Sequence, residues 1–576
     1  MNYAASAQTD TLARLPGWRA SVLFIALLGG LAGLFGRGIY LQGIHDDFLQ
    51  RKGDARYSRV IEVTAHRGMI SDRNGEPLAV STPVESVWAS PPDVEADRQQ
   101  VRKLARVLDM DTKELKDRLN DTTRDFVYLK RQLPPDQTEQ VVRMDLPGIS
   151  LQREYRRYYP TGEEAAQVLG FTNMDDNGQE GMELALQGAL AGKSGSQRVI
   201  RDNRGFIVED AGGMTPPKPG GDVVLSLDSK LQHLAYSELG NAVRQHHAKA
   251  GAVVVLDSRT GEVLALANFP GYNPNNHSKV DSHTMRNRAI IDLFEPGSTM
   301  KPFTIATALE EGKVRPNTLI NTENGVITID NRKIHDAHPD AMLTVAQVIQ
   351  KSSNVGAAKI SLSLKPESLW QSLVDCGFGA QTGSGFPGEA SGILHPPKSW
   401  RPIEQATIAY GHGISVSLLQ LARAYTIFAS DGELKPISLL KQDGPVTGTR
   451  IFSERTVREM RKMLEMVVMP GGTAPLAQIS GYQVAGKTGT AHKLENGRYV
   501  DHYVASFVGF APASSPRLVV AVMIDDPAGY DYYGGDVAAP VFSKVTGAAL
   551  HALNVPNDAP VDNVVPPPAE TVKEEV

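Results

Sequence analysis

Three short elements of the sequence carry residue types that could transfer an acyl group together. They are Ser-Thr-Met-Lys at 298–301, Ser-Ser-Asn at 352–354 and Lys-Thr-Gly-Thr at 487–490. The second begins 54 residues after the first (352 minus 298), and the third begins 135 residues after the second (487 minus 352). One such motif alone would say little, because short motifs recur by chance in a chain of 576 residues. Their order and spacing within one region favour a single site.

Ser298 is the candidate nucleophile, and Lys301 is the candidate general base. Pro296 and Gly297 break the preceding structure, and the apolar run at 303–309 predicts a helix that starts near Ser298. The first turn of a helix has free N–H groups that stabilise an oxyanion, and the N–H of Ser298 is one of them. Residues three apart share a helix face, so the Lys301 amine can take the proton of the hydroxyl. Lysine has an ordinary pKa of about 10.4, so the site must lower the pKa of this amine by burial or by a nearby cation.

The third element supplies that cation and a second oxyanion donor. Lys487 carries a positive charge that also suits the carboxylate of a substrate. Gly489 leaves room for an acyl group to lie against the main chain, and the N–H of Thr490 is the second candidate donor to the oxyanion. Thr488 lies between them as a candidate substrate-binding residue. All four belong to a run, 484–491, that predicts an accessible edge strand.

The second element completes the candidate site. Ser352 can relay a proton to a leaving amine, and Asn354 can hold a substrate amide. Taken one by one, the residues of the three elements also have ordinary structural interpretations: a helix cap, a solvated lysine, a turn and a strand end. Order, spacing and context favour the catalytic interpretation.

The sequence gives no indication of a metal, another cofactor or a nucleic-acid partner. Possible metal ligands gather at His335, Asp336, His338 and Asp340. The two histidines have no third ligand at a spacing typical of a metal site, so a metal site is not expected. Cys376 is the only cysteine and lies in an apolar stretch, which predicts a small buried side chain and excludes an internal disulfide. A net charge of −6 without a long basic stripe argues against binding a phosphate backbone.

A membrane anchor is predicted near the N-terminus, at residues 20–41. Residues 20–36 carry no formal charge and, at about 1.5 Å per residue, span about 26 Å as a helix, which is just enough to cross a bilayer. No small-x-small cleavage site is visible before Arg37, which favours an uncleaved anchor over a secretory signal. Basic residues flank the run on both sides, so the charge rule leaves the orientation open.

The rest of the chain divides into two domains and a tail. Helical and strand-like patterns over 58–215 predict an irregular α+β domain. The segment 216–221 is dense in Pro and Gly and separates it from a second α+β domain at 222–553. Strand-like runs at both ends of that domain predict one antiparallel sheet whose halves meet in space. Residues 555–576 are rich in Pro and acidic side chains, so we expect a disordered tail.

These features together resemble the class B penicillin-binding proteins, most closely the division-specific septal transpeptidases. A Ser-x-x-Lys element followed by a serine-containing and a Lys-Thr-Gly element is the signature shared by penicillin-binding proteins and class A β-lactamases. Further segments carry the resemblance: 67–75, 157–160, 180–183, 202–205, 294–298, 351–356 and 410–413.

The resemblance implies a penicilloyl-serine transferase fold, similar to that of β-lactamases, with an antiparallel sheet and a helical subdomain at 222–553. It implies a non-catalytic, dimerisation-type pedestal at 58–215 and a cytoplasmic N-terminus at 1–19, before a single-pass anchor in the bacterial inner membrane. The catalytic domain would lie in the periplasm. His412 stands where relatives often have tyrosine, which bears on substrate preference and β-lactam selectivity.

The resemblance also implies a reaction and its partners. The enzyme would attack the D-Ala-D-Ala bond of a peptidoglycan stem peptide, release D-Ala and transfer the acyl group to an amine on a neighbouring stem, without a cofactor. β-Lactams would acylate the same serine. The implied partners are nascent stem peptides, membrane lipid, a lipid-linked glycan polymerase of the SEDS type and other divisome proteins.

Three alternatives remain open at this point. A β-lactamase must activate water to remove the acyl group, and class A enzymes do so with Glu-x-x-x-Asn, which does not occur between Asn354 and Lys487. We therefore expect a long-lived acyl-enzyme. A non-catalytic β-lactam sensor or scaffold would have no need for all of the site residues. An elongation-type or condition-specific paralogue would share every one of them.

Overall fold

The computed structural model describes most of the chain, namely residues 17–41, 58–201, 207–210, 214–276, 280–495, 497–529, 532–566 and 572–573. The chain divides into two compact units. The first comprises 1–64, 84–154 and 194–218, and the second comprises 65–83, 155–193 and 219–576. The predicted domain limits at 58–215 and 222–553 stay predictions, and most of the predicted N-terminal segment 1–19 lies outside the described residues.

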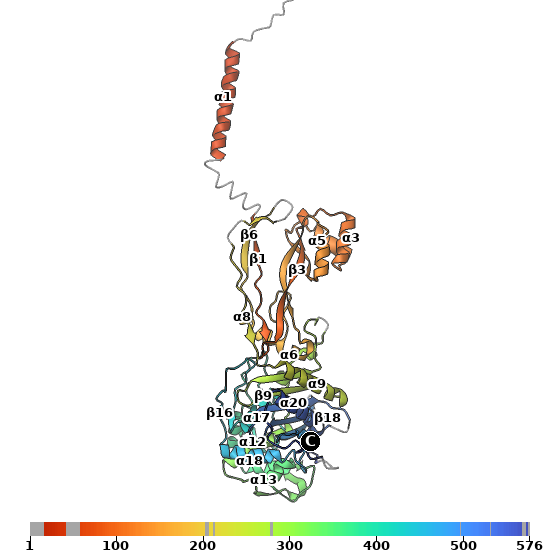
Figure 1. The fold of residues 1–576 in the computed structure, drawn as a ribbon. Helices are drawn as coiled ribbons and strands as arrows, with labels where there is room; N and C mark the ends of the chain where they lie inside the picture. Colours follow the sequence, from red (N-terminus) through yellow and green to blue (C-terminus); the bar gives the residue numbers. More distant parts are fainter. Residues whose placement is uncertain are drawn as a thin grey trace, which may run out of the picture. The chain divides into compact units, whose positions relative to one another are not determined.

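The first unit includes a helix where the anchor is predicted, α1 (Gly17–Ile39) (Figure 1). It has 23 residues, none of them buried, and is long and apolar enough to cross a membrane. A separate small core forms around Leu104, Leu115 and Leu129, because amphipathic helices pack their apolar faces against a strand. The other elements of this unit are β1 (Ser58–Val63), β6 (Gly195–Arg201), β7 (Ile207–Asp210), α3 (Arg98–Val107), α4 (Thr112–Asn120), β4 (Val127–Leu133), α5 (Pro135–Val142) and the parts of β3 (Pro77–Ala89) and β5 (Ile149–Tyr158) that belong to it.

The second unit is built on a five-stranded antiparallel sheet. Its strand order is β10 (Val263–Phe269), β9 (Ala250–Asp257), β19 (Leu518–Asp525), β18 (Arg498–Ala511) and β17 (Ala485–Glu495). β9 pairs with β19, so strands from the two ends of the predicted domain do meet in one sheet, as the sequence predicts. β17, which carries residues 487–490, is an edge strand, also as predicted.

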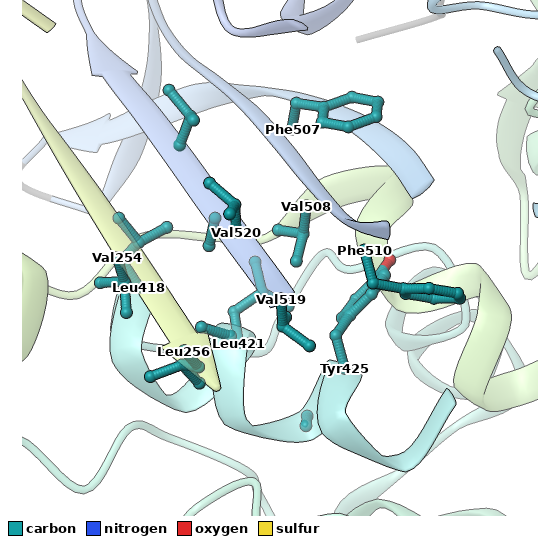
Figure 2. Packing of buried hydrophobic residues seen from close by; sticks show 14 of the residues in the cluster. Val254, Leu256, Leu418, Leu421, Tyr425, Phe507, Val508, Phe510, Val519 and Val520 are labelled. Carbon is teal, nitrogen blue, oxygen red and sulfur yellow. The ribbon is translucent and has the colours of Figure 1, made fainter. Parts of the chain in front are cut away.

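Helices cover both faces of this sheet. Leu256, Val519 and Phe510 are neighbours across three strands, and Figure 2 shows them packed against α17 (Leu418–Ala429) through Leu421 and Tyr425. On the other face, the ring of Phe507 lies 4.7 Å from that of Phe542 on α20 (Ala539–Ala552), and α20 packs beside α9 (Ser229–Gln245). Burial of apolar side chains on both faces makes this sheet the rigid base of the unit.

The remaining elements of the second unit are mostly short. They are β2 (Ile70–Ser71), α6 (Ala166–Leu169), α7 (Gly181–Ala185), α8 (Gln187–Leu190), β8 (Val223–Val224), α10 (Ser282–Met285), α11 (Arg288–Ile291), α12 (Lys301–Glu310), β11 (Leu319–Asn321), β12 (Val326–Ile329), β13 (Arg332–His335), β14 (Met342–Thr344), α13 (Val345–Gln350), α14 (Asn354–Leu362), α15 (Pro366–Asp375), α16 (Pro402–Ile408), β15 (Glu433–Leu434), β16 (Thr449–Arg450), α18 (Glu454–Glu465) and α19 (Gly534–Val537).

Three segments that carry the family resemblance meet in a buried ion-pair cluster of the second unit. Nη2 of Arg67 lies 2.6 Å from Oε2 of Glu183, and Nε of Arg157 lies 2.7 Å from Oε1 of the same carboxylate. All three side chains are buried. Arg67 also donates from Nη1 to Oε1 of Gln187 at 2.7 Å. The cluster cross-links segments that are far apart in the sequence.

The described part of the predicted tail differs from the expectation of disorder. Residues 555–566 form hydrogen bonds with the loop that precedes β17; for example, the Tyr482 hydroxyl donates to the carbonyl of Val555 at 2.7 Å. The composition of this segment suggested disorder because it offers little apolar surface. Most of its hydrogen bonds involve main-chain groups, and Val555 packs against the hydrophobic core, neither of which composition reveals.

Candidate active site

The structure brings the predicted nucleophile, base and proton relay into one buried network. Nζ of Lys301 donates to Oγ of Ser298 at 2.8 Å and to Oγ of Ser352 at 3.0 Å. Nζ of Lys487 donates to the same Ser352 hydroxyl at 2.9 Å. Ser298 and Ser352 are each 4 % exposed, and both lysines are fully buried. Burial penalises the charged form of an amine, and a general base must be neutral to accept a proton.

Ser298 lies in a short 3-10 turn, Gly297–Met300, that leads directly into α12. The sequence predicts a helix start here, and the structure adds how the turn is held. Gly297 has φ +57, and a Cβ at this position would lie 3.1 Å from the carbonyl oxygen of Thr490. The Tyr425 hydroxyl of α17 donates to the carbonyl of Thr299 at 2.9 Å. The nucleophile is thus fixed between the edge strand β17 and the helix beneath the sheet.

Ser352 adopts a strained backbone conformation between α13 and α14. Its φ is +62, which L-residues rarely adopt and which is typical of positions where surrounding contacts enforce a functional geometry. The next residue, Ser353, caps α14 by accepting from the N–H of Gly356 at 2.8 Å. The turn before this cap points the Ser352 hydroxyl at the two lysines.

Asp336, a member of the His/Asp cluster considered for metal binding, holds this second element. Its Oδ2 accepts from the Ser353 hydroxyl at 2.6 Å, and its Oδ1 accepts from the N–H of Val355 at 2.9 Å. Asn354 donates from Nδ2 to the carbonyl of His335 at 3.3 Å. Within the described part of the chain, no group of three or more His, Cys, Asp or Glu side chains is arranged to hold a metal ion.

The third element lines the edge of the sheet beside the nucleophile. Nζ of Lys487 also donates to Oγ1 of Thr488 at 3.1 Å, and Oγ1 of Thr490 accepts from the N–H of Gly534 at 3.1 Å. A Cβ at Gly489 would lie 2.6 Å from the carbonyl oxygen of Pro296, so glycine is needed here for the approach of the nucleophile's loop. The main chains of Ser298 and Thr490 therefore lie close together, as two oxyanion donors require.

Sequence reasoning missed one group of residues beside the nucleophile. Glu295 accepts from the N–H of Gly413 at 2.9 Å and from the Tyr499 hydroxyl at 3.1 Å through both carboxylate oxygens. Burial raises the pKa of Glu295. Burial, and then the charge on Glu295, raises the pKa of Tyr499 to about 12, so the phenol stays a donor. No local pattern could pair these residues, because 204 positions separate them (499 minus 295).

His412 was noted in the sequence, and the structure places its ring between two tyrosines. Ring centroids lie 5.2 Å from Tyr410 and 6.1 Å from Tyr499. Burial, then the charges of Lys301 and His492, lower the pKa of His412 to about 4. The imidazole is therefore neutral at physiological pH and adds no charge beside Lys301.

A row of aromatic side chains on the same side of β17 was also missed. The ring of His492 lies 4.8 Å from that of Tyr503, Tyr503 stacks on Tyr532 at 4.1 Å, and Tyr532 stacks on Tyr533 at 4.4 Å. These residues come from separate segments, so only the tertiary structure aligns them.

Comparison with known proteins identifies the family. Residues 251–547 match the penicillin binding protein transpeptidase domain, and residues 62–225 match the penicillin-binding protein dimerisation domain. The chain is 44% identical over 548 residues to a probable peptidoglycan D,D-transpeptidase, PenA, of Neisseria meningitidis, with 94% of each chain covered. It is 43% identical over 551 residues to peptidoglycan D,D-transpeptidase FtsI of Escherichia coli, covering 94% of this chain and 93% of the relative.

Two solved structures agree. The transpeptidase domain of Burkholderia pseudomallei penicillin-binding protein 3 is 50% identical with a TM-score of 0.54, covering 58% of this chain and 98% of that one. A peptidoglycan synthetase from Bifidobacterium adolescentis is 25% identical with a TM-score of 0.70, covering 88% and 99%. These matches cover both predicted domains and the whole catalytic network. The chain belongs to the class B penicillin-binding proteins and is similar to their septal, FtsI-type members.

Proposed function

We propose that this protein is a peptidoglycan D,D-transpeptidase of the division septum that works through an acyl-enzyme on Ser298. The observation that carries the proposal is the buried contact of 2.8 Å between Nζ of Lys301 and Oγ of Ser298. An activated nucleophile needs a base within hydrogen-bond reach, and this contact supplies one in a site shielded from water.

Acylation follows from the geometry. Neutral Lys301 removes the proton of Ser298 as Oγ attacks the carbonyl carbon of the penultimate D-Ala of a stem peptide. The tetrahedral oxyanion is stabilised by the N–H groups of Ser298 and Thr490. The C–N bond then breaks, and the leaving amine of the terminal D-Ala takes a proton through the Ser352 hydroxyl from the lysine network. The products are the acyl ester and free D-Ala.

Deacylation reverses the proton path. An amine on a neighbouring stem peptide attacks the ester carbonyl and loses a proton through the same network. The C–O bond to Ser298 breaks, and the serine hydroxyl is restored as the new cross-link forms. Asn354 orients the substrate amide, while Lys487 and Thr488 bind the terminal carboxylate of the donor peptide. Gly489 lets the loop that carries the nucleophile lie close against this strand.

β-Lactams react by the same first step, with the lactam amide in place of the D-Ala-D-Ala bond. The chain lacks the Glu-x-x-x-Asn element that class A β-lactamases use to activate water. The penicilloyl ester should therefore persist, and β-lactams should inhibit the enzyme rather than serve as substrates.

The proposed location follows from the substrate. With α1 as a single anchor in the inner membrane, the N-terminus is cytoplasmic and the catalytic domain lies in the periplasm, where stem peptides are cross-linked. A SEDS-type glycan polymerase that delivers nascent strands, together with other divisome proteins, forms the proposed set of partners. The similarity to FtsI over 94% of this chain supports the septal assignment.

The proposal is tested by labelling the full-length, detergent-solubilised protein with a fluorescent penicillin. We expect one adduct, on the tryptic peptide containing Ser298, that is stable for many minutes and absent from Ser298→Ala. An adduct elsewhere, or rapid turnover of a chromogenic β-lactam, would overturn it. Depletion in the native host separates the remaining alternatives: filaments support the septal role, and round cells support elongation. Restored septation by Ser298→Ala would favour a scaffold.

A further inference from the structure

The chain after α20 runs along the loop that leads into the catalytic strand β17. Asn563 makes three hydrogen bonds to that loop. Its Oδ1 accepts from the N–H of Gly481 at 2.9 Å, and its Nδ2 donates to the carbonyls of Ile479 at 3.2 Å and Tyr482 at 2.9 Å. One side chain thus satisfies three main-chain groups of a turn, which fixes the turn's conformation.

Two further pairs extend this contact on either side. Asp558 accepts from the N–H of Gln483 at 2.7 Å through Oδ1 and from the Ser514 hydroxyl at 2.6 Å through Oδ2. At the other end, the Gln478 amide donates to the carbonyl of Val565 at 3.0 Å and accepts from its N–H at 2.9 Å. The hydrogen bonds thus cover the loop from residue 478 to residue 483.

The contact is close as well as polar. Gly481 has φ +82, and a Cβ there would lie 2.7 Å from the side chain of Asn557. The side chain of Tyr482 is 1 % exposed, and its hydroxyl donates to the carbonyl of Val555. The hydrogen bonds around Asn563 are partly buried, so breaking them would leave donors and acceptors that water can satisfy only in part.

The loop held in this way touches the catalytic strand at both of its ends. At one end, Oγ1 of Thr473 is 2.7 Å from Oγ1 of Thr488. At the other, Gln483 precedes the first residue of β17 by two positions and Lys487 by four. β17 pairs with β18 alone in the sheet and also contacts α18 and α19, and this loop is the segment that leads directly into its first residue.

We propose that residues 555–566 form a strap that positions β17 for acylation. The strap holds the loop 473–484, and the loop sets the position of Lys487 and of the Thr490 N–H relative to Ser298. Asn563 is the central positioning residue, since it bonds to three main-chain groups of the turn. This inference rests on the proposed roles of Ser298 and Lys487. It assigns a role to a segment outside the residues, 251–547, that match the transpeptidase family.

The test compares acylation rates of full-length variants in detergent, well below their melting temperatures, with fluorescent penicillin from sub-saturating to saturating concentration. Asn563→Ala should acylate Ser298 about fivefold more slowly at saturation, because small displacements of a positioned catalytic group cost rate steeply. Asp562→Ala, with an exposed side chain beside it, should match the wild type. A chain ending at residue 566 should also acylate at the wild-type rate. A chain ending at residue 554 should acylate more slowly than Asn563→Ala.

A synthetic peptide of residues 555–566 should restore the rate of the chain that ends at 554. If Asn563→Ala lowers the melting temperature but acylates at the wild-type rate, the strap only stabilises the fold and the proposal is wrong. If the chain ending at 554 does not fold, the point variant alone decides. Failure of the wild type itself to label would instead count against the proposed function.

Discussion

Two buried clusters of the second unit hold basic side chains in different ways. At the active site, Lys301 and Lys487 donate to the hydroxyl of Ser352. In the other cluster, Arg67 and Arg157 both donate to the carboxylate of Glu183. Arginine stays protonated in proteins and forms fixed forks with carboxylates, whereas the pKa of lysine responds to burial. The comparison teaches that the residue type, and not burial itself, separates a cluster that moves protons from one that locks structure.

The largest expected effect is the loss of the base. Lys301→Met should slow acylation by fluorescent penicillin about 1,000-fold, because general-base catalysis contributes on the order of 100- to 10,000-fold. The melting temperature should hardly change, since replacing a buried amine by an apolar side chain of similar size is often neutral or stabilising. Stopped-flow labelling and a thermal scan measure the two quantities.

Lys544→Met is the matched control, because this lysine is exposed and pairs with Glu238 on the surface. It should leave both quantities unchanged. Near-wild-type acylation by Lys301→Met would remove Lys301 from the role of base, and a large fall in its melting temperature would erase the distinction between the two clusters.

In the arginine cluster we expect a loss of stability without a loss of acylation rate. Glu183→Ala leaves two buried guanidinium groups without their shared carboxylate and should lower the free energy of unfolding by about 3 kcal/mol, the lower end for a broken buried pair. The lower end applies because Arg67 keeps its hydrogen bond to Gln187. The acylation rate of the folded protein at low temperature should stay at the wild-type value. Chemical denaturation and labelling measure these effects.

Glu139→Ala provides the comparison, since Glu139 pairs with Arg143 at 3.1 Å on the surface, where ion pairs contribute at most about 1 kcal/mol. A Glu183→Ala protein as stable as Glu139→Ala would show that the buried cluster does not hold the fold.

The sequence was sufficient to predict which residues gather around Ser298 and much of the sheet. Ser298, Lys301 and Lys487 were predictable because their chemistry restricts the residue type at each position. That strands from both ends of the domain share one sheet was predictable, because β9 and β19 are apolar up to their final Asp and so must be covered on both faces. Each motif or strand is visible within about ten residues, and the order and spacing of the three motifs along the chain link them.

What could not be predicted depends on contacts between distant segments. The left-handed conformation of Ser352 leaves no mark in its sequence neighbourhood, since serine usually avoids it. The role of Asp336 could not be predicted, because its partners Ser353 and Val355 become its neighbours only in the folded chain. The sequence alone therefore left a metal ligand as one interpretation of this residue. The composition of the strap around Asn563 predicted disorder. Composition does not show the hydrogen bonds that an amide side chain can make to main-chain groups far away in the sequence.

A third test uses the neutral imidazole next to the lysines. The pKa of His412 is about 4 in the folded protein, against about 6.5 when unfolded. As the pH falls below about 6.5, His412 takes up a proton in the unfolded chain before it does so in the folded protein. The stability that comes from burying the neutral imidazole is therefore present above about pH 6.5 and is lost toward pH 4. Relative to His412→Gln, the wild type should therefore lose about 3 kcal/mol of unfolding free energy between pH 7 and pH 4.

Urea denaturation at several pH values measures this difference. The raised pKa of Glu295 acts in the opposite direction, but Glu295 is present in both proteins and largely cancels. A difference between the two proteins that does not vary with pH would mean that His412 is not kept neutral by its surroundings. The site would then place a second titrating cation beside Lys301.

The smallest expected effect concerns the carboxylate at the active site, which binds a hydroxyl rather than a guanidinium. Tyr499→Phe removes the donor to Glu295 and keeps the ring between His412 and His492. Tyr499 is 53% exposed, so water can replace the lost bond, and the acylation rate should fall only about threefold, equivalent to about 0.7 kcal/mol. Glu295→Gln keeps an acceptor for both donors and should stay closer to the wild type than Tyr499→Phe. If Glu295→Gln loses more rate than Tyr499→Phe, the charge of Glu295 matters more than its hydrogen bond to Tyr499, and this carboxylate would resemble Glu183 after all.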